Sequence, residues 1–223
     1  GQIMTIHIIG VDCATQAVNI GLAHGVFVDG QLKIVAVDVG SKSVALVETI
    51  LSWIGAAQDV LIALDAPLGW PQGLGDELSN HIAGKPLNGE PNQLFRRRTD
   101  KFIKDTIGKT PLDVGADRIA RTAHAALVLL DQIQLKTGKL IPLAWQPGIL
   151  TGKSAIEVYP AACLIAHGIQ ASGYKRKGGQ VARRALVREL AARMELPKDT
   201  ALLESNDDAL DAVICCLAGA DFL

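Results

Sequence analysis

Residues 60–65 read VLIALD, an unbroken apolar run that ends on an acidic residue. A strand with no polar residue on either face is typical of the covered centre of a parallel or mixed sheet. The preceding segment, residues 43–57, repeats its apolar positions at helical spacing and predicts a helix that leads into this strand. The two segments together indicate an α/β fold with a buried central strand.

The first forty residues predict three antiparallel strands. Residues 6–12 (IHIIGVD) form a short apolar run, and residues 18–28 and 32–39 follow with the same character. Asp29-Gly30 between the last two is a strong signal for a tight β-hairpin. A hairpin start followed by alternating helices and strands predicts a mixed sheet flanked by helices.

Beyond the fourth strand, residues 66–110 are punctuated by glycine and proline. This stretch is too long for a structureless connection in a compact domain, so we expect an insertion of loops and short helices there. A fifth strand is predicted over residues 155–159. Further helices are predicted over 116–136, 180–195 and 209–223.

Length and composition favour one domain over residues 1–223 with its own apolar core. The chain is 49% apolar and 20% charged, and its net charge of −1 gives no overall attraction to nucleic acid or membrane. A polyanion would therefore have to bind a local basic patch. No apolar stretch reaches the ~18 residues of a membrane span, and the four cysteines form no CxxC pair. We expect a cytoplasmic protein that does not enter a membrane.

Acidic residues stand where ligand sites form in such a sheet. Asp12 ends the first predicted strand and Asp65 follows the apolar strand, and ligands bind at the carboxyl ends of strands in open α/β sheets. If the two strands are neighbours, both carboxylates lie at the same edge. Asp208 and Asp211 begin the closing helix one turn apart, so they share one helix surface.

Carboxylates that converge in this way repel one another unless a cation neutralises them. Carboxylate oxygens select Mg²⁺ or Mn²⁺, and two such ions about 3.5–4 Å apart can activate water and stabilise the leaving oxygen of a phosphodiester. The pattern predicts a metal-dependent nuclease, although acids in the first turn of a helix also suit its dipole and cap. The predicted ligands are Asp12, Asp65, Asp208 and Asp211.

Five short motifs occur in the order that a known family shows. They are GVD at 10–12, DAPLG at 65–69, RRR at 96–98 with Asp100, EVYPAA at 157–162 and DALDA at 208–212. Together they resemble domain-of-unknown-function family 429, described as predicted nucleases. The resemblance implies a ribonuclease H-like, five-stranded mixed sheet with a helical insertion after the fourth strand. It also implies metal-dependent phosphodiester hydrolysis with DNA or RNA as the partner.

The pattern Asp208-x-x-Asp211-Ala is also similar to the closing motif of bacterial Holliday-junction resolvases, which implies a possible homodimer. Within the family resemblance, Glu157 is either an extra acid near the cluster or the structural partner of an arginine. Arg97 and Arg98 could grip a substrate phosphate bidentately. A second basic stretch at 175–193 is either a phosphate-binding surface or a solvated helix face.

Two other functions fit parts of the pattern. A sugar-kinase or actin-like phosphotransferase has a similar sheet and first loop, but Ala14 stands where its phosphate loop needs glycine. A non-catalytic regulator would keep the fold and use the insertion to bind a partner or a phosphorylated ligand. Near-neutral charge and only 4% aromatic residues favour the regulator. Acids at three separated positions favour the nuclease.

Overall fold

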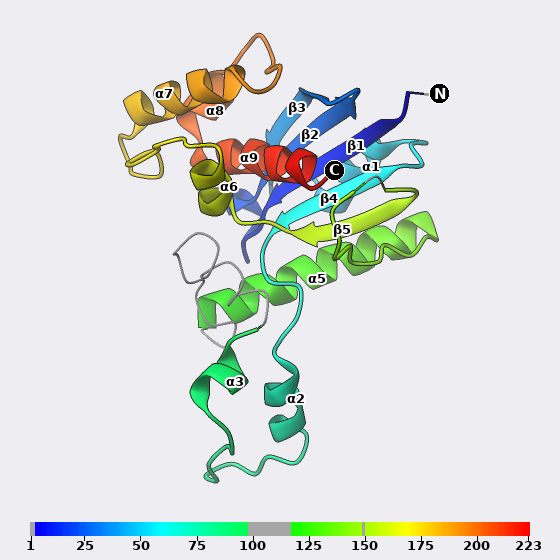
Figure 1. The fold of residues 1–223 in the computed structure, drawn as a ribbon, viewed down its shortest axis with the longest axis vertical. Coiled ribbons are helices and arrows are strands. Elements are labelled where there is room, and N and C mark those ends of the chain that lie inside the picture. Colours follow the sequence, from blue (N-terminus) through cyan, green and yellow to red (C-terminus); the bar gives the residue numbers. More distant parts are fainter. Residues whose placement is uncertain (1–2, 98–116, 149) are drawn as a thin grey trace.

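The computed structural model describes residues 3–97, 117–148 and 150–223. Its five strands form one sheet in the order β3-β2-β1-β4-β5 (Figure 1). The strands are β1 (Thr5–Asp12), β2 (Gly21–Val28), β3 (Gln31–Val39), β4 (Val60–Asp65) and β5 (Lys153–Glu157).

Strand pairing gives the sheet its fold class. β1, β2 and β3 form an antiparallel meander, whereas β4 runs parallel to β1 and β5 parallel to β4. This mixed order is the ribonuclease H-like arrangement, so the predicted fold class is confirmed. The predicted hairpin is confirmed too: Asp29 and Gly30 have φ values of 51° and 74°, the positive φ at both central positions that a type I′ turn requires.

Helices cover both faces of the sheet, and each face has its own apolar core. On one face α9 crosses β1 to β4, and on the other α1 contacts α5 (Figure 1). None of the helices within the described residues is long and apolar enough to cross a membrane. The first face carries α6 (Pro160–Ala166), α7 (Gln180–Ala191), α8 (Ala201–Ser205) and α9 (Asp207–Phe222), and the second carries α1 (Leu46–Ile54) and α5 (Asp117–Thr137).

Side-chain alternation decides which strand residues face α9. On β1, Ile8 belongs to the core under α9 and Ile9 to the core under α1 and α5. Because successive side chains of a strand point to opposite faces, Asp12 lies on the α9 face. On β4, Ala63 belongs to the core under α9, so Asp65 lies on that face as well.

Several elements differ from the sequence expectation, and two of the helices, α1 and α7, are shorter than predicted. The fifth strand ends at Glu157 rather than at residue 159, because the helix α6 begins at Pro160. The sequence did not predict α6, because its seven residues are too few to show helical periodicity. Residues 18–20 do not extend β2, because the 3₁₀ turn η1 (Ala17–Asn19) precedes that strand.

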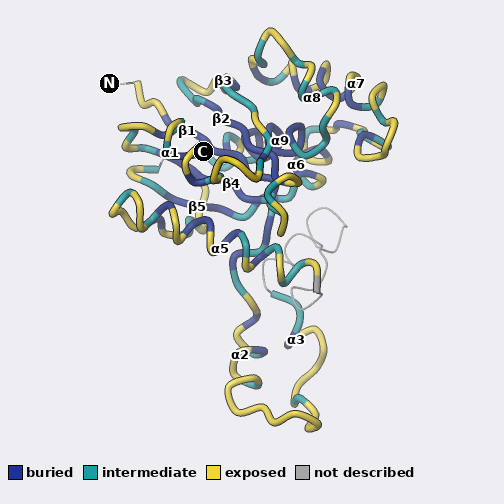
Figure 2. The backbone as a smooth tube through the Cα atoms, turned by 180° about the vertical axis from the view of Figure 1, so that it is seen from behind, coloured by how far each residue is buried: buried dark blue, intermediate teal, exposed yellow. Residues whose placement is uncertain are grey.

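The insertion after β4 forms an arm, as far as it is described. Its helices α2 (Gln72–Leu78) and α3 (Pro91–Phe95) contact each other and extend away from the sheet (Figure 1). Most of the arm is exposed, in contrast to the buried strands (Figure 2). The part of the predicted insertion from 98 to 110, which includes Arg98, lies outside the described residues.

Two glycines allow α9 to lie directly on the sheet. A Cβ atom at Gly10 would stand 2.1 Å from the carbonyl oxygen of Ala212, and one at Gly21 would stand 1.9 Å from that of Asp208. Neither distance leaves room for a methyl group, so the helix backbone touches β1 and β2. This contact places the first turns of α9 above the carboxyl end of β1.

We predict that Gly10→Ala and Gly21→Ala each lower the free energy of unfolding by about 3 kcal/mol or more, because the clash is with backbone that cannot rotate away. Urea unfolding measures the change. Gly75→Ala is the matched control: it lies inside α2 with open space around a new Cβ, and alanine is the better helix former. Equal destabilisation by all three variants would contradict the proposed packing constraint.

Candidate metal centre

Asp12 and Asp65 lie side by side at the carboxyl ends of β1 and β4. They are partners in the parallel register of β1 and β4, and neighbouring strands lie about 4.8 Å apart. Both point to the α9 face. Asp12 is buried and Asp65 is half-buried. The predicted convergence of these two strand ends is therefore present in the structure.

α9 adds Asp208 and Asp211 from above. Asn206 caps this helix by accepting a 2.9 Å hydrogen bond from the Ala209 amide. The carboxyl of Asp12 interacts with those of Asp208 and Asp65, the nearest acids on the helix and on the sheet. Asp12 is thus the centre of the cluster, with one acid on its own sheet and one on the helix.

The environment raises the pKa of all four acids. Burial raises the pKa of Asp12 and of Asp65, and the negative charge of Asp211 raises both further. Burial also raises the pKa of Asp208 and of Asp211. Removing water and crowding like charges both disfavour the ionised form, so the cluster needs positive charge from elsewhere to ionise fully.

Part of that charge comes from a neighbouring loop. Asp211, only 1% exposed, accepts a 2.7 Å hydrogen bond from the Tyr174 hydroxyl and lies 2.9 Å from Lys175 Nζ. The Lys175 ammonium also offsets part of the rise that burial causes in the pKa of Asp65 and of Asp208. Among the described residues, Lys175 is the cation that acts on these acids, and one ammonium does not neutralise four carboxylates.

A buried arginine of α7 fixes this loop. Arg183 donates to the carbonyl oxygens of Glu204 at 2.6 Å, Tyr174 at 3.0 Å and Arg176 at 3.2 Å. In the sequence Arg183 is one of several basic residues compatible with a solvated helix face, but in the structure it is buried and bonded to backbone. Tyr174 and Lys175 reach Asp211 because of this support. The sequence indicates Tyr174 as an aromatic residue near the site and Lys175 as part of the second basic stretch, but it predicts neither as a partner of Asp211.

The donor set fits a hard divalent cation. Its ligands are carboxylate oxygens, partly buried and more negative than Lys175 can offset, which suits Mg²⁺ or Mn²⁺. The oxygens of the aspartates do not meet at one point. Among the described residues, no three of these aspartates have oxygens that all lie within 4.8 Å of one another. Like-charge repulsion explains that spacing.

Glu157 does not join the aspartates. Ile156 belongs to the core under α9, so the next side chain along β5 points to the opposite face. There Glu157 Oε1 accepts from the Leu68 amide at 2.7 Å and from Arg97 Nη1 at 2.5 Å, and Oε2 accepts from the Tyr159 hydroxyl at 3.0 Å. Of the two interpretations of Glu157, this geometry supports the partner of an arginine.

Arg97 is accordingly part of a structural contact. Its guanidinium also donates to the Tyr159 hydroxyl at 3.1 Å, and its side chain is only 10% exposed. The contact ties the end of the inserted arm to β5. Binding of a substrate phosphate by Arg97 stays a prediction, as does that by Arg98.

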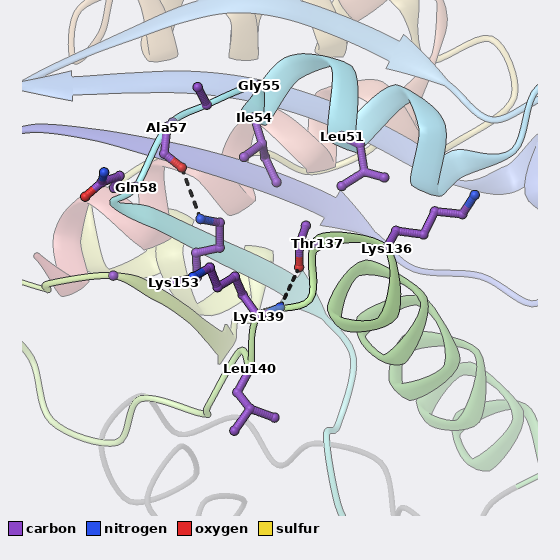
Figure 3. A pocket seen from close by; sticks show the side chains of 12 residues that line it. Leu51, Ile54, Gly55, Ala57, Gln58, Lys136, Thr137, Lys139, Leu140 and Lys153 are labelled. Atoms are coloured by element: carbon purple, nitrogen blue, oxygen red, sulfur yellow. Dashed lines mark hydrogen bonds between the residues drawn. The ribbon is translucent and has the colours of Figure 1, made fainter.

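A cavity of about 830 Å³ lies at the opposite ends of the strands, where β4 and β5 begin. Figure 3 shows Lys136, Lys139 and Lys153 around it. Lys153 donates to the carbonyl of Ala57 at 3.1 Å, and Lys136 pairs with Glu48 at 2.7 Å. Since the aspartates stand at the carboxyl ends of the strands, this cavity is separate from them.

Comparison with known proteins identifies the family. The chain matches the family described as "Protein of unknown function (DUF429)" over residues 10–222, and it belongs to that family. The search of curated proteins found no match. Among solved structures, RuvC of T. thermophilus in complex with a Holliday junction substrate is similar over 96% of this chain and 97% of that chain. That similarity has 11% identity and a TM-score of 0.35, so the fold class rests on the strand order and pairing described above.

We predict that Asp12→Asn stabilises the metal-free protein at neutral pH, by about 1–2 kcal/mol. In the wild type, the folded-state pKa of Asp12 is raised above its unfolded value, so ionisation costs stability as pH rises above the unfolded pKa of about 4. The gain from the amide is therefore expected at pH 7 and absent below about pH 4. Thermal unfolding across this pH range measures it.

Asp131→Asn is the control, because Asp131 is exposed on α5 at the other face of the sheet. It should leave the unfolding midpoint unchanged at every pH. Destabilisation by Asp12→Asn at pH 7 in the absence of metal would contradict the repulsive cluster.

Proposed function

We propose that the chain is a nuclease that hydrolyses phosphodiester bonds of DNA or RNA with divalent metal ions held by the aspartate cluster. The observation that supports this proposal is the gathering of Asp65, Asp208 and Asp211 around Asp12, with Lys175 as the cation that offsets their charge among the described residues. Keeping like charges together in a partly buried place is costly, and a bound cation removes the cost.

Each acid has a distinct place in the proposed site. Asp12 contacts both Asp65 and Asp208, so it is the ligand best placed to serve two ions, and those two acids would complete the set on either side. Asp211 is held by Tyr174 and Lys175, which suits a further ligand or a group that orients the attacking water. A bound Mg²⁺ or Mn²⁺ would lower the pKa of water and offset charge on the leaving oxygen.

The loop beside the aspartates is the best-supported phosphate-binding surface. Lys175, Arg176 and Lys177 follow one another there and are exposed, whereas Arg97 is enclosed by Glu157 and Tyr159. Local positive charge is what a chain of net charge −1 needs in order to bind a polyanion. We therefore assign contact with the nucleic-acid backbone to this loop. A homodimer, implied by the resolvase-like motif, stays a prediction.

A non-catalytic regulator on the same fold is the second candidate. The ion pair of Lys175 with Asp211 and the raised pKa of Asp12 favour the regulator, because both make the acids tolerable without metal. Metal binding separates the two functions, since a nuclease of this kind requires the ion and a regulator does not.

We predict that Mn²⁺ binds the wild type and that Asp12→Asn lowers its affinity by about a hundredfold or more, because the central ligand loses its charge. Isothermal titration measures both proteins, with Asp131→Asn as the control that should bind as the wild type does. Unchanged Mn²⁺ affinity in Asp12→Asn would contradict the proposed site.

We predict that Arg176→Ala and Lys177→Ala each weaken binding of a DNA or RNA duplex of any sequence. Each variant should reduce the slope of log affinity against log salt by about 1, since one phosphate contact is lost. Fluorescence anisotropy over a range of salt concentrations measures the slope. Lys139→Ala is the control, because Lys139 lies beside the cavity at the opposite ends of the strands; this variant should leave the slope unchanged. The same slope in all variants would contradict the assignment of the loop.

A further inference from the structure

A second group of metal-binding side chains lies at the far end of α9. Cys163 belongs to α6, His167 directly follows that helix, and Asp221 lies in the last turn of α9. Among the described residues, this is the one group of three whose ligand atoms all lie within 4.8 Å of one another. Thirteen residues of helix separate Asp221 from Asp208, a distance of about 20 Å at 1.5 Å per residue. The group is therefore distinct from the aspartate centre.

The three side chains converge on one oxygen atom. Asp221 Oδ2 lies 2.7 Å from His167 Nε2 and 3.8 Å from Cys163 Sγ. Cys163 and His167 are four residues apart, which places them on the same side of a helical turn. α6 and α9 pack against each other, so segments more than fifty residues apart in the chain supply the donors (Figure 1).

The surroundings leave one side open. The Cys163 thiol is buried, whereas the side chains of His167 and Asp221 are 24% and 46% exposed. An ion could enter from solvent and keep a water molecule on that side. On the other side, Arg193 donates to the backbone carbonyl of His167 at 3.2 Å and helps to fix the end of α6.

The donor set differs in kind from the aspartate centre. A thiolate, an imidazole nitrogen and a carboxylate oxygen are the ligands of zinc, whereas Mg²⁺ and Mn²⁺ prefer oxygen alone. Zinc bonds of about 2.0–2.3 Å in a tetrahedron place neighbouring ligand atoms about 3–4 Å apart. Three protein ligands with a water in the fourth position are a common zinc coordination.

A nucleophilic triad is the other chemistry that these residue types suggest, and the geometry opposes it. In such a triad the imidazole stands between the nucleophile and the acid. Here the acid stands between the imidazole and the thiol. Burial, together with the charge of Asp221, raises the pKa of the Cys163 thiol to about 12, so without a metal it remains protonated and unreactive.

A simple His–Asp hydrogen bond explains less of the arrangement. It accounts for the 2.7 Å contact of His167 with Asp221 but not for a buried thiol directed at the same carboxylate oxygen. A cation among the three would satisfy all of them. As the metal binds, the thiol would release its proton to solvent, and the two hydrogen bonds to Asp221 Oδ2 would break. The neutral imidazole of His167 would then carry its proton on Nδ1 and bind the ion through Nε2.

We propose that Cys163, His167 and Asp221 bind one zinc ion, with water as the fourth ligand. Zinc here joins the end of α6 to the last turn of α9, the helix whose first turns carry Asp208 and Asp211. The ion braces the helix that the aspartate centre depends on. This inference does not require that the aspartates bind metal.

Cobalt titration of the full chain tests the site, because four-coordinate Co²⁺ bound to a thiolate gives charge-transfer and visible absorption bands. We expect one Co²⁺ per chain to give both bands, apart from any Co²⁺ that the oxygen ligands of the aspartates bind, and we expect both bands to disappear when Zn²⁺ is added. Cys163→Ser should abolish the charge-transfer band, and His167→Ala should weaken binding about tenfold or more. His167 is partly exposed, so its variant keeps the test valid if Cys163→Ser does not fold.

Two controls separate this site from the aspartate centre. Cys13→Ser removes a thiol whose pKa is raised by burial and by the charges of Asp65 and Asp12, and it should leave the cobalt spectrum unchanged. Asp12→Asn should also leave it unchanged, even where it abolishes Mn²⁺ binding. Absence of a thiolate band in the wild type, or its persistence in Cys163→Ser, would overturn the proposal.

Discussion

The direct contact of α9 with β1 and β2 is the constraint on which the rest of the structure depends. It exists because Gly10 and Gly21 have no side chain where the helix backbone passes. That contact brings Asp208 and Asp211 over strand ends that already carry Asp12 and Asp65. The same helix is almost wholly buried along its length, so its position cannot adjust to relieve repulsion among the acids.

Charge compensation then divides the cluster into two parts. Asp211 is satisfied by Tyr174 and Lys175, which are presented by a loop that the buried Arg183 holds through three carbonyl oxygens. Asp12 and its two neighbours have raised pKa values, so they hold their protons to a higher pH than free carboxyl groups do. Replacement of those protons by divalent cations is the step that would turn a strained group of acids into a reactive centre.

The sheet and the four aspartates were predictable because they follow from local rules: strand ends, alternation and helical spacing. The place of Glu157 was not, because the sequence does not show which face of β5 is turned towards α9. Tyr174 and Lys175 reach the site through Arg183, a tertiary contact that leaves no periodic signal. Likewise, Cys163 and His167 show helical spacing, but only the fold brings Asp221 to them.

Anomalous diffraction from crystals of the chain soaked in Mn²⁺ tests the central claim most directly. The proposed site predicts a manganese peak in contact with Asp12, together with Asp65 or Asp208, on the α9 face of the sheet. A structure at saturating Mn²⁺ with no peak at Asp12 would contradict a metal-dependent centre.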